Sequence, residues 1–338
     1  MRPQSPVPTK VVKKPPHAIL DGLLSALIVV ECIVVVGVLP LDLLGLLGGL
    51  LAVVAVAVGV TKRSFCVGGR YISQRFLKHL GDPLKKDVTM RKFTDQSWQL
   101  VIHASMTVLE LYVLQDEAWW SDTTTRTCVL ARTSAQTSLE FRPTNLRLLP
   151  TQVYDHIIAI WLYTAFSCKF LEEVRKDYLV MMAHHVVTIA LVTLSFVMNY
   201  LPIGVLVLLL HDASDVPLDL LKMANYLKLE ARQGFYITEV LFAIMLSVWL
   251  YCRVYMFPTK IIRSSMWESR VACAVPLETW DFTISWLGFN LMLLALYALH
   301  IWWTFLLLRL LYNALSNSGI HTAAEVEYEG GSDSDKED

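Results

Sequence analysis

The sequence predicts an all-α, polytopic integral membrane helix bundle of seven or eight transmembrane helices. Hydrophobic residues make up 55% of the 338 positions and charged residues only 17%, whereas soluble domains carry about 25% charged residues. Several apolar runs reach the roughly 20 residues that a spanning helix needs. Lys and Arg also gather on one side of the topology that these runs define. The net charge of −1 says nothing about partners, and no nucleic-acid partner is expected.

Eight runs are long and apolar enough to count as predicted spans. They cover residues 18–39, 41–60, 97–115, 152–171, 179–200, 203–221, 235–257 and 282–311. Pro40 separates the first two, which predicts a tight helical hairpin. If that hairpin were one span plus a buried segment, the total would be seven.

Basic residues favour the eight-span arrangement. With eight spans, most Lys and Arg residues fall in the N-terminal tail, in the segment 61–92 and in two short loops on the same side. Because cytosolic loops are enriched in Lys and Arg, both termini are predicted to be cytosolic.

The chain is expected to divide into four segments. They are an N-terminal tail and hairpin (1–60), a basic cytosolic linker (61–91), a membrane domain (92–311) and an acidic cytosolic tail (312–338). In the tail, Ser332 and Ser334 each precede an acidic residue by three positions, a pattern that suits phosphorylation by an acid-directed kinase. A purely solubilising tail is the alternative. A disulfide between Cys128 and Cys273, both in predicted non-cytosolic loops, is also left open.

Two neighbouring spans carry ionisable residues inside apolar sequence, where each costs several kcal/mol. At 100° per residue, one helix places four side chains within about 60° of each other. This polar stripe consists of His184, Thr188, Ser195 and Asn199. His185 points about 100° away from it, so the two histidines are not expected to play the same role.

The next span carries a second polar group. Asp212, Asp215 and Asp219 share one helical face, and His211 lies four residues before Asp215, close enough to interact. The turn at residues 199–202 is short, so the two helices must run antiparallel. Both polar groups are therefore predicted to converge at similar depth, in the cytosolic half of the bundle interior.

Three explanations fit this group of polar residues. A neutral imidazole oriented by a carboxylate is a good general base near pH 7 and can accept an acyl group. Histidines and aspartates can also hold zinc or iron, but the sequence has no HExxH motif and no repeated HxxxH boxes, so no metal is predicted. Buried polar groups that only pack helices together are the third explanation.

The same residues resemble the signature of ceramide synthases, within the TLC-domain membrane family. The matching positions are Arg175-Lys176-Asp177-Tyr178, Met181, His184-His185, Thr188, Ser195, Asn199, Gly204, His211-Asp212, Ser214-Asp215, Lys222 and Asn225-Tyr226. Upstream, KFTDQSW at residues 92–98 resembles the segment that opens the domain, so the similarity runs from about residue 92 to 311. Two departures are Asp219, where glutamate is expected, and Pro217, which can kink its helix.

This resemblance implies acyl transfer from a fatty acyl-CoA to the amine of a sphingoid base, in the endoplasmic reticulum membrane and without a cofactor. It assigns catalysis to His184, His185, His211, Asp212 and Asp215. It assigns substrate binding to Thr188, Ser195, Asn199, Ser214 and Asp219, and CoA binding to Arg175, Lys176 and Lys222. Membrane lipid is a further expected partner, and a homo- or heterodimer is left open. A non-catalytic TLC-domain protein, acting in lipid sensing or translocation, is the alternative, although such proteins are expected to lack the paired histidines and aspartates.

Overall fold

The computed structural model describes residues 18–38, 41–76, 83–115, 149–170, 178–197, 200–227, 229, 236–268 and 280–316. Within these ranges the protein is helical apart from a few connecting residues, which confirms the predicted all-α class. The helices are α1 (Ala18–Val38), α2 (Leu41–Phe76), α3 (Pro83–Leu114), α6 (Leu149–Phe170), α7 (Tyr178–Val197), α8 (Leu201–Tyr226), α9 (Ile237–Trp249), the π-helix η2 (Leu250–Glu268) and α11 (Trp280–Ser316). Helix α9 continues into η2 without a break, so each predicted span corresponds to one helical rod.

The protein is a multi-pass membrane protein. Among the described residues, five segments are long and apolar enough to cross a bilayer by themselves. These segments are Ala18–Val35, Leu47–Gly69, Tyr178–Ser195, Ile237–Trp267 and Trp286–Asn313. Helix α8 is not one of them. It carries three aspartates and Lys222, so it depends on its neighbours to shield these groups from lipid.

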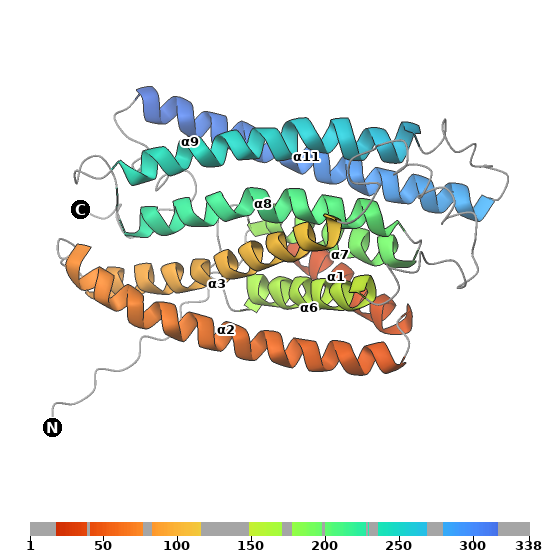
Figure 1. Cartoon of the computed structure of the whole chain (residues 1–338), viewed down its shortest axis with the longest axis horizontal. Helices are drawn as coiled ribbons and strands as arrows, with labels where there is room; N and C mark the ends of the chain where they lie inside the picture. Colours follow the sequence, from red (N-terminus) through yellow and green to blue (C-terminus); the bar gives the residue numbers. More distant parts are fainter. Residues whose placement is uncertain are drawn as a thin grey trace.

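Successive rods run in alternating directions along the bundle (Figure 1). In this view α1 runs toward the right end, where α2 begins, and α11 returns to the left end. The turn between α7 and α8 is short, with the Tyr200 backbone N–H bonded to the Ser195 carbonyl at 2.7 Å. Pro202 lies in the first turn of α8, where a missing backbone N–H costs nothing. The antiparallel pairing predicted for these helices is therefore present.

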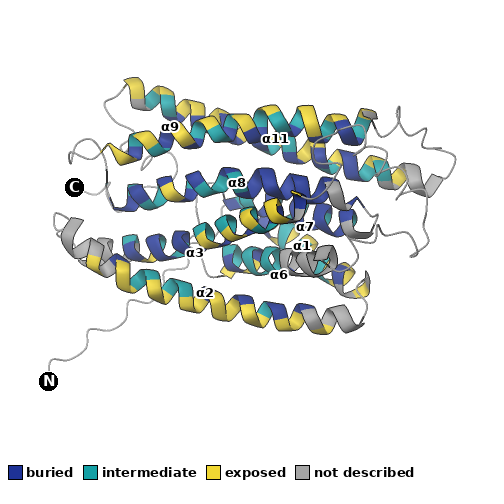
Figure 2. Ribbon diagram, in the orientation of Figure 1, coloured by how far each residue is buried: buried dark blue, intermediate teal, exposed yellow. Residues whose placement is uncertain are grey.

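Helix α8 forms the core of the bundle. Its residues from Ile203 to Asp212 are all buried, and α3, α7, α9 and η2 pack around it. By contrast α1 and α2 expose many large apolar side chains on their outer faces (Figure 2), as expected of surfaces that meet lipid. The central position of α8 places its polar residues in the bundle interior.

The N-terminal hairpin is attached to the rest of the bundle by a buried polar cluster. Lys169 Nζ on α6 lies 2.5 Å from both carboxylate oxygens of Asp21 on α1. The Tyr178 hydroxyl on α7 donates to the same carboxylate at 2.7 Å. Asp21 is therefore neutralised where α1 meets α6 and α7.

Helix covers most of the segment predicted as a basic linker. Helix α2 continues to Phe76 and α3 begins at Pro83, and the cytosolic location of this segment stays a prediction. The two helices approach closely at Gly69, where an added Cβ would lie 2.5 Å from Met90 Cε and 3.1 Å from the Phe93 ring. Cys128, Cys273, Ser332 and Ser334 lie outside the described residues, so the disulfide and the phosphorylation sites stay predictions.

Candidate active site

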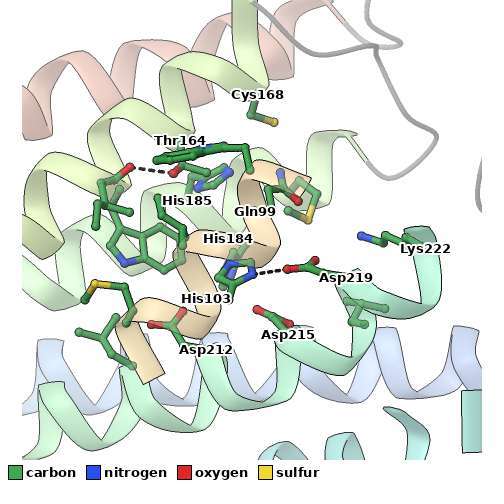
Figure 3. Close-up of a pocket in the computed structure, with 18 of the residues that line it drawn as sticks. Gln99, His103, Thr164, Cys168, His184, His185, Asp212, Asp215, Asp219 and Lys222 are labelled. Carbon is green, nitrogen blue, oxygen red and sulfur yellow. Dashed lines mark hydrogen bonds and ion pairs between the residues drawn. The ribbon is translucent and has the colours of Figure 1, made fainter. Parts of the chain in front are cut away.

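A cavity of about 130 Å³ lies inside the bundle, with walls from α3, α6, α7, α8, α9, η2 and α11 (Figure 3). Six residues assigned from the sequence line it: His184, His185, Asp212, Asp215, Asp219 and Lys222. They come from the first half of α7 and from the middle and second half of α8. The two polar groups thus converge on one cavity, in the half of the bundle where α7 begins and α8 ends.

Both histidines of the pair face this cavity, although helical phase separates them. Their ring centroids are 5.9 Å apart, and each lies edge-on to Trp161 at 5.7 Å. Trp303 flanks His184 on another side at 5.5 Å. Among the described residues, neither Nδ1 has a hydrogen-bond partner, though both atoms are buried. Aromatic rings therefore fix the positions of the two imidazoles without occupying these nitrogens.

His211 supports His184 from behind the cavity wall. The two rings stack at 6.0 Å with an angle of 23°. His211 Nδ1 lies 2.6 Å from the Val207 carbonyl, and Nε2 lies 2.8 Å from His300 Nε2. A carbonyl only accepts, so Nδ1 is the donor there, and a neutral His211 accepts at Nε2 from His300. Both nitrogens are engaged away from Asp215, so no hydrogen bond joins His211 to that carboxylate.

Asp215 is paired with Arg253, a cation buried on η2. Arg253 Nη2 donates to Asp215 Oδ1 at 2.6 Å, and Nε donates to the Ser214 hydroxyl at 2.7 Å. The Ser214 hydroxyl in turn donates to the His211 carbonyl at 2.9 Å. The guanidinium also lies 4.2 Å above the Trp249 ring, a cation–π geometry. Ser214 and Asp215 therefore bind a cation of the protein itself.

Asp219 is held by two residues of α3. Gln96 Nε2 donates to Oδ1 at 2.5 Å, and His103 Nδ1 lies 2.7 Å from Oδ2. The aspartate is only 1% exposed, while His103 reaches the cavity wall. The dashed line between His103 and Asp219 in Figure 3 marks this imidazole–carboxylate pair.

Asp212 faces the cavity beside a second carboxyl group. Glu110 on α3 also lines the cavity and interacts electrostatically with Asp212. Both Glu110 oxygens are buried, and the carboxyl groups of Glu110 and Asp212 lie within interaction distance of each other. This pair gives the cavity an acidic region that suits a cationic group of a ligand.

Of the remaining assigned residues, some are described away from the cavity wall and others are not described. In the described ranges, Thr188 and Ser195 are buried but are not on the cavity wall. The Ser195 hydroxyl donates to the Val192 carbonyl of its own helix at 2.8 Å. Asn199, Arg175 and Lys176 lie outside the described residues, so their roles stay predictions. Over the same described ranges, no group of three or more His, Cys, Asp or Glu side chains is arranged to hold a metal ion.

Several polar residues of the site were missed in the sequence. Each is ionisable and lies inside a predicted span: His103, Glu110, Arg253 and His300. The signal that singled out the histidine pair, an ionisable side chain within apolar sequence, would have found all four. What that signal does not give is which residues meet, because their partners lie on other helices.

Comparison with known proteins agrees with this architecture. A TLC-domain profile matches residues 92–309. ASC1-like protein 1 of Oryza sativa subsp. japonica is 30% identical over 241 residues, which cover 71% of this chain and 74% of that protein. Ceramide synthase 4 of Homo sapiens is 31% identical over 243 residues, 71% of this chain and 55% of that protein. Ceramide synthase 1 LOH3 of Arabidopsis thaliana is 28% identical over 260 residues, 74% and 81% of the two chains. The chain therefore belongs to the TLC-domain family and is related within it to ceramide synthases and ASC1-like proteins.

Proposed function

We propose that the protein is an N-acyltransferase of the endoplasmic reticulum membrane. It transfers the acyl group of a fatty acyl-CoA to the amine of a sphingoid base, releasing dihydroceramide or ceramide and CoA. The observation that carries this proposal is the cavity itself, where His184 and His185 stand opposite carboxyl groups on α8. The relation to ceramide synthases supports the choice of substrates.

The reaction suits this set of side chains. A thioester is already activated, whereas a sphingoid amine arrives protonated and must lose a proton before it attacks. His184 is proposed either to act as general base or to carry the acyl group on an imidazole nitrogen, with His185 in the complementary role. In the second route the C–S bond breaks as the N-acyl bond forms, and the amine then displaces the imidazole from the acyl carbon.

The carboxylates divide into two groups by their partners. Asp215 is neutralised by Arg253 at 2.6 Å, so its role is to position η2 and α8 rather than to bind the substrate. Asp212 and Glu110 are the carboxyl groups that face the cavity together. They are proposed to hold the ammonium group of the sphingoid base beside the histidines.

The phosphates of CoA require positive charge near the cytosolic mouth. Lys222 also lines the cavity. It lies about four helical turns after Leu208, close to the C-terminal end of α8. Together with Arg175 and Lys176, it is proposed to attract these phosphates, as lysine does in other phosphate sites.

The proposal is tested in microsomes that carry the chain, supplied with sphinganine and a panel of acyl-CoAs. The wild type is expected to form N-acyl product, and His184→Ala and His185→Ala are expected to lose at least about 100-fold of that activity, the range of a lost acid–base group. His321→Ala, outside the matched domain, is the control and should retain activity. Full activity in both cavity variants would contradict the assigned roles. No N-acyl product from the wild type would favour the non-catalytic alternative.

A further inference from the structure

The pairing of His103 with Asp219 is a feature that neither the proposed reaction nor the sequence motif uses. We propose that His103 is a further catalytic residue, a general base that takes the proton of the substrate ammonium, and that Asp219 orients it. This inference rests on the proposed N-acyl transfer and assigns one of its proton transfers to a named atom, Nε2 of His103.

The geometry fixes the tautomer of this histidine. Asp219 Oδ2 lies 2.7 Å from His103 Nδ1, and a carboxylate can only accept there, so the proton of a neutral ring resides on Nδ1. Gln96 holds the other carboxylate oxygen at 2.5 Å, which prevents the carboxylate from turning away. Nε2 is then the basic nitrogen, on a ring that lines the cavity (Figure 3). This is the arrangement by which a buried aspartate orients the histidine base of a hydrolase.

The histidine pair on α7 lacks this feature. Among the described residues, the Nδ1 atoms of His184 and His185 have no hydrogen-bond partner, so no carboxylate orients either ring through Nδ1. An imidazolium at His103 would instead be stabilised directly by Asp219. A division of labour follows, in which the α7 pair handles the acyl group and His103 handles the proton of the amine.

The surrounding charges favour delivery of an ammonium to this base. Asp212 and Asp215 on α8 and Glu110 on α3 line the same cavity. Of these, Asp215 is offset by Arg253 from η2. Lys222, on α8, lies three residues beyond Asp219. The carboxyl groups of Asp212 and Glu110 are thus left on the α8 and α3 walls of the cavity that His103 also lines.

The substrate R–NH₃⁺ transfers one proton to His103 Nε2 and becomes the free amine. The amine nitrogen attacks the acyl carbon, the C–N bond forms, and the bond from that carbon to its leaving group breaks. In direct attack on the thioester, the second amine proton departs with CoA, which leaves as the thiol. In attack on an acyl-histidine, this proton departs with the imidazole, which passes it to the CoA thiolate released when the histidine was acylated. In both routes His103 then returns its proton to water.

The deciding experiment is a pH profile of N-acyl transfer in microsomes that carry His103→Asn. The Asn side-chain amide takes the place of Nδ1 and preserves the link to Asp219 but removes Nε2. The variant is expected to lose about 100-fold or more near pH 7 and to recover toward wild type as pH rises through the range of primary amines, roughly 8 to 10. Recovery is expected because the free amine then no longer needs a base. Asp219→Asn, which favours the wrong tautomer, is expected to show the same pH-dependent loss.

A purely structural role for the pair predicts a different result. If His103 only ties α3 to α8, His103→Asn will retain activity at all pH values, or an unstable variant will lose it equally at all of them. Either outcome overturns the proposal, and thermal unfolding of the variant distinguishes the two. Failure of the proposed function itself is recognised separately, because the wild type would then form no N-acyl product at any pH.

Discussion

Arg253 connects several groups of the bundle interior. Its guanidinium contacts Asp215, the Ser214 hydroxyl and the His211 carbonyl on α8, and it covers the Trp249 ring on α9. Only 3% of the residue is exposed. A buried charge of this kind is tolerated because its donors meet acceptors on a neighbouring helix.

Removal of Arg253 should therefore destabilise the bundle. Arg253→Met leaves Asp215 without its cation, and breaking one side of a buried pair costs about 3–5 kcal/mol in the free energy of unfolding. The double variant Arg253→Met/Asp215→Leu should recover most of this loss, because neither charge then remains buried and unpaired. Thermal unfolding in detergent measures both.

Lys260→Met provides the matched control for this prediction. Lys260 is an exposed residue on the same helix, so its replacement should change stability by no more than about 0.5 kcal/mol. Equal stability of Arg253→Met and the wild type would show that the ion pair contributes nothing.

For single residues, the sequence predicts which side chains belong to the candidate site better than it predicts which side chains they contact. His184, His185 and the α8 aspartates are visible because they interrupt apolar runs, and the short turn after α7 brings them together. The pairing of Asp215 with Arg253 joins residues 38 positions apart. It depends on how η2 is rotated against α8, which periodicity within either helix does not determine.

At the scale of elements, the contact between α2 and α3 depends on a missing side chain. A Cβ at Gly69 would lie 2.5 Å from Met90 Cε and 3.1 Å from Phe93 ring atoms, whereas one at Gly68 would meet nothing within 4 Å. Neighbouring glycines on the same helix therefore differ in whether they face α3.

This difference provides a matched pair of variants. Gly68→Ala should be neutral or stabilising by about 0.5–1 kcal/mol, the helical preference for alanine over glycine. Gly69→Ala gains the same preference, but the new methyl group must push the Met90 and Phe93 side chains of α3 away from α2. Overpacking of this kind costs about 1–3 kcal/mol. Thermal unfolding should thus place Gly69→Ala below Gly68→Ala, and the reverse order would contradict the close approach of α2 and α3.

The ends of the helices were harder to predict than their existence. The apolar run that predicted a span at 41–60 stops where basic residues begin, yet α2 continues to Phe76. Hydropathy locates the part of a helix that suits lipid, while the helix itself continues as long as its residues permit. Similarly, the span predicted at 235–257 continues as the π-helix η2 to Glu268, a change of helix type that the apolar pattern does not reveal.

In the whole molecule, the described helical rods alternate in direction, so that α1 starts toward the same end of the bundle at which α11 ends (Figure 1). We predict that this end is cytosolic, because Lys and Arg are in excess in the segments assigned to it. In sealed microsomes, protease should therefore remove tags at both the N- and the C-terminus, while a tag inserted between residues 119 and 150 should be protected. Protection of either terminal tag would contradict this topology.

The cavity wall draws on most of the bundle, and its histidine pair and Lys222 lie toward the end where α7 begins and α8 ends. If that end is cytosolic, as we predict, the proposed acyl-CoA would approach from the cytosol and the proposed sphingoid base from the membrane. The cavity is therefore expected to be the place where the two substrates meet.

The proposed N-acyl transfer can be measured with purified protein reconstituted in lipid vesicles and supplied with sphinganine and acyl-CoA. Free CoA and N-acyl sphinganine should be measured together by mass spectrometry. We expect the two to appear in equal amounts and both to disappear in the His184→Ala/His185→Ala double variant. Release of CoA without amide product, or equal product from the double variant, would contradict it.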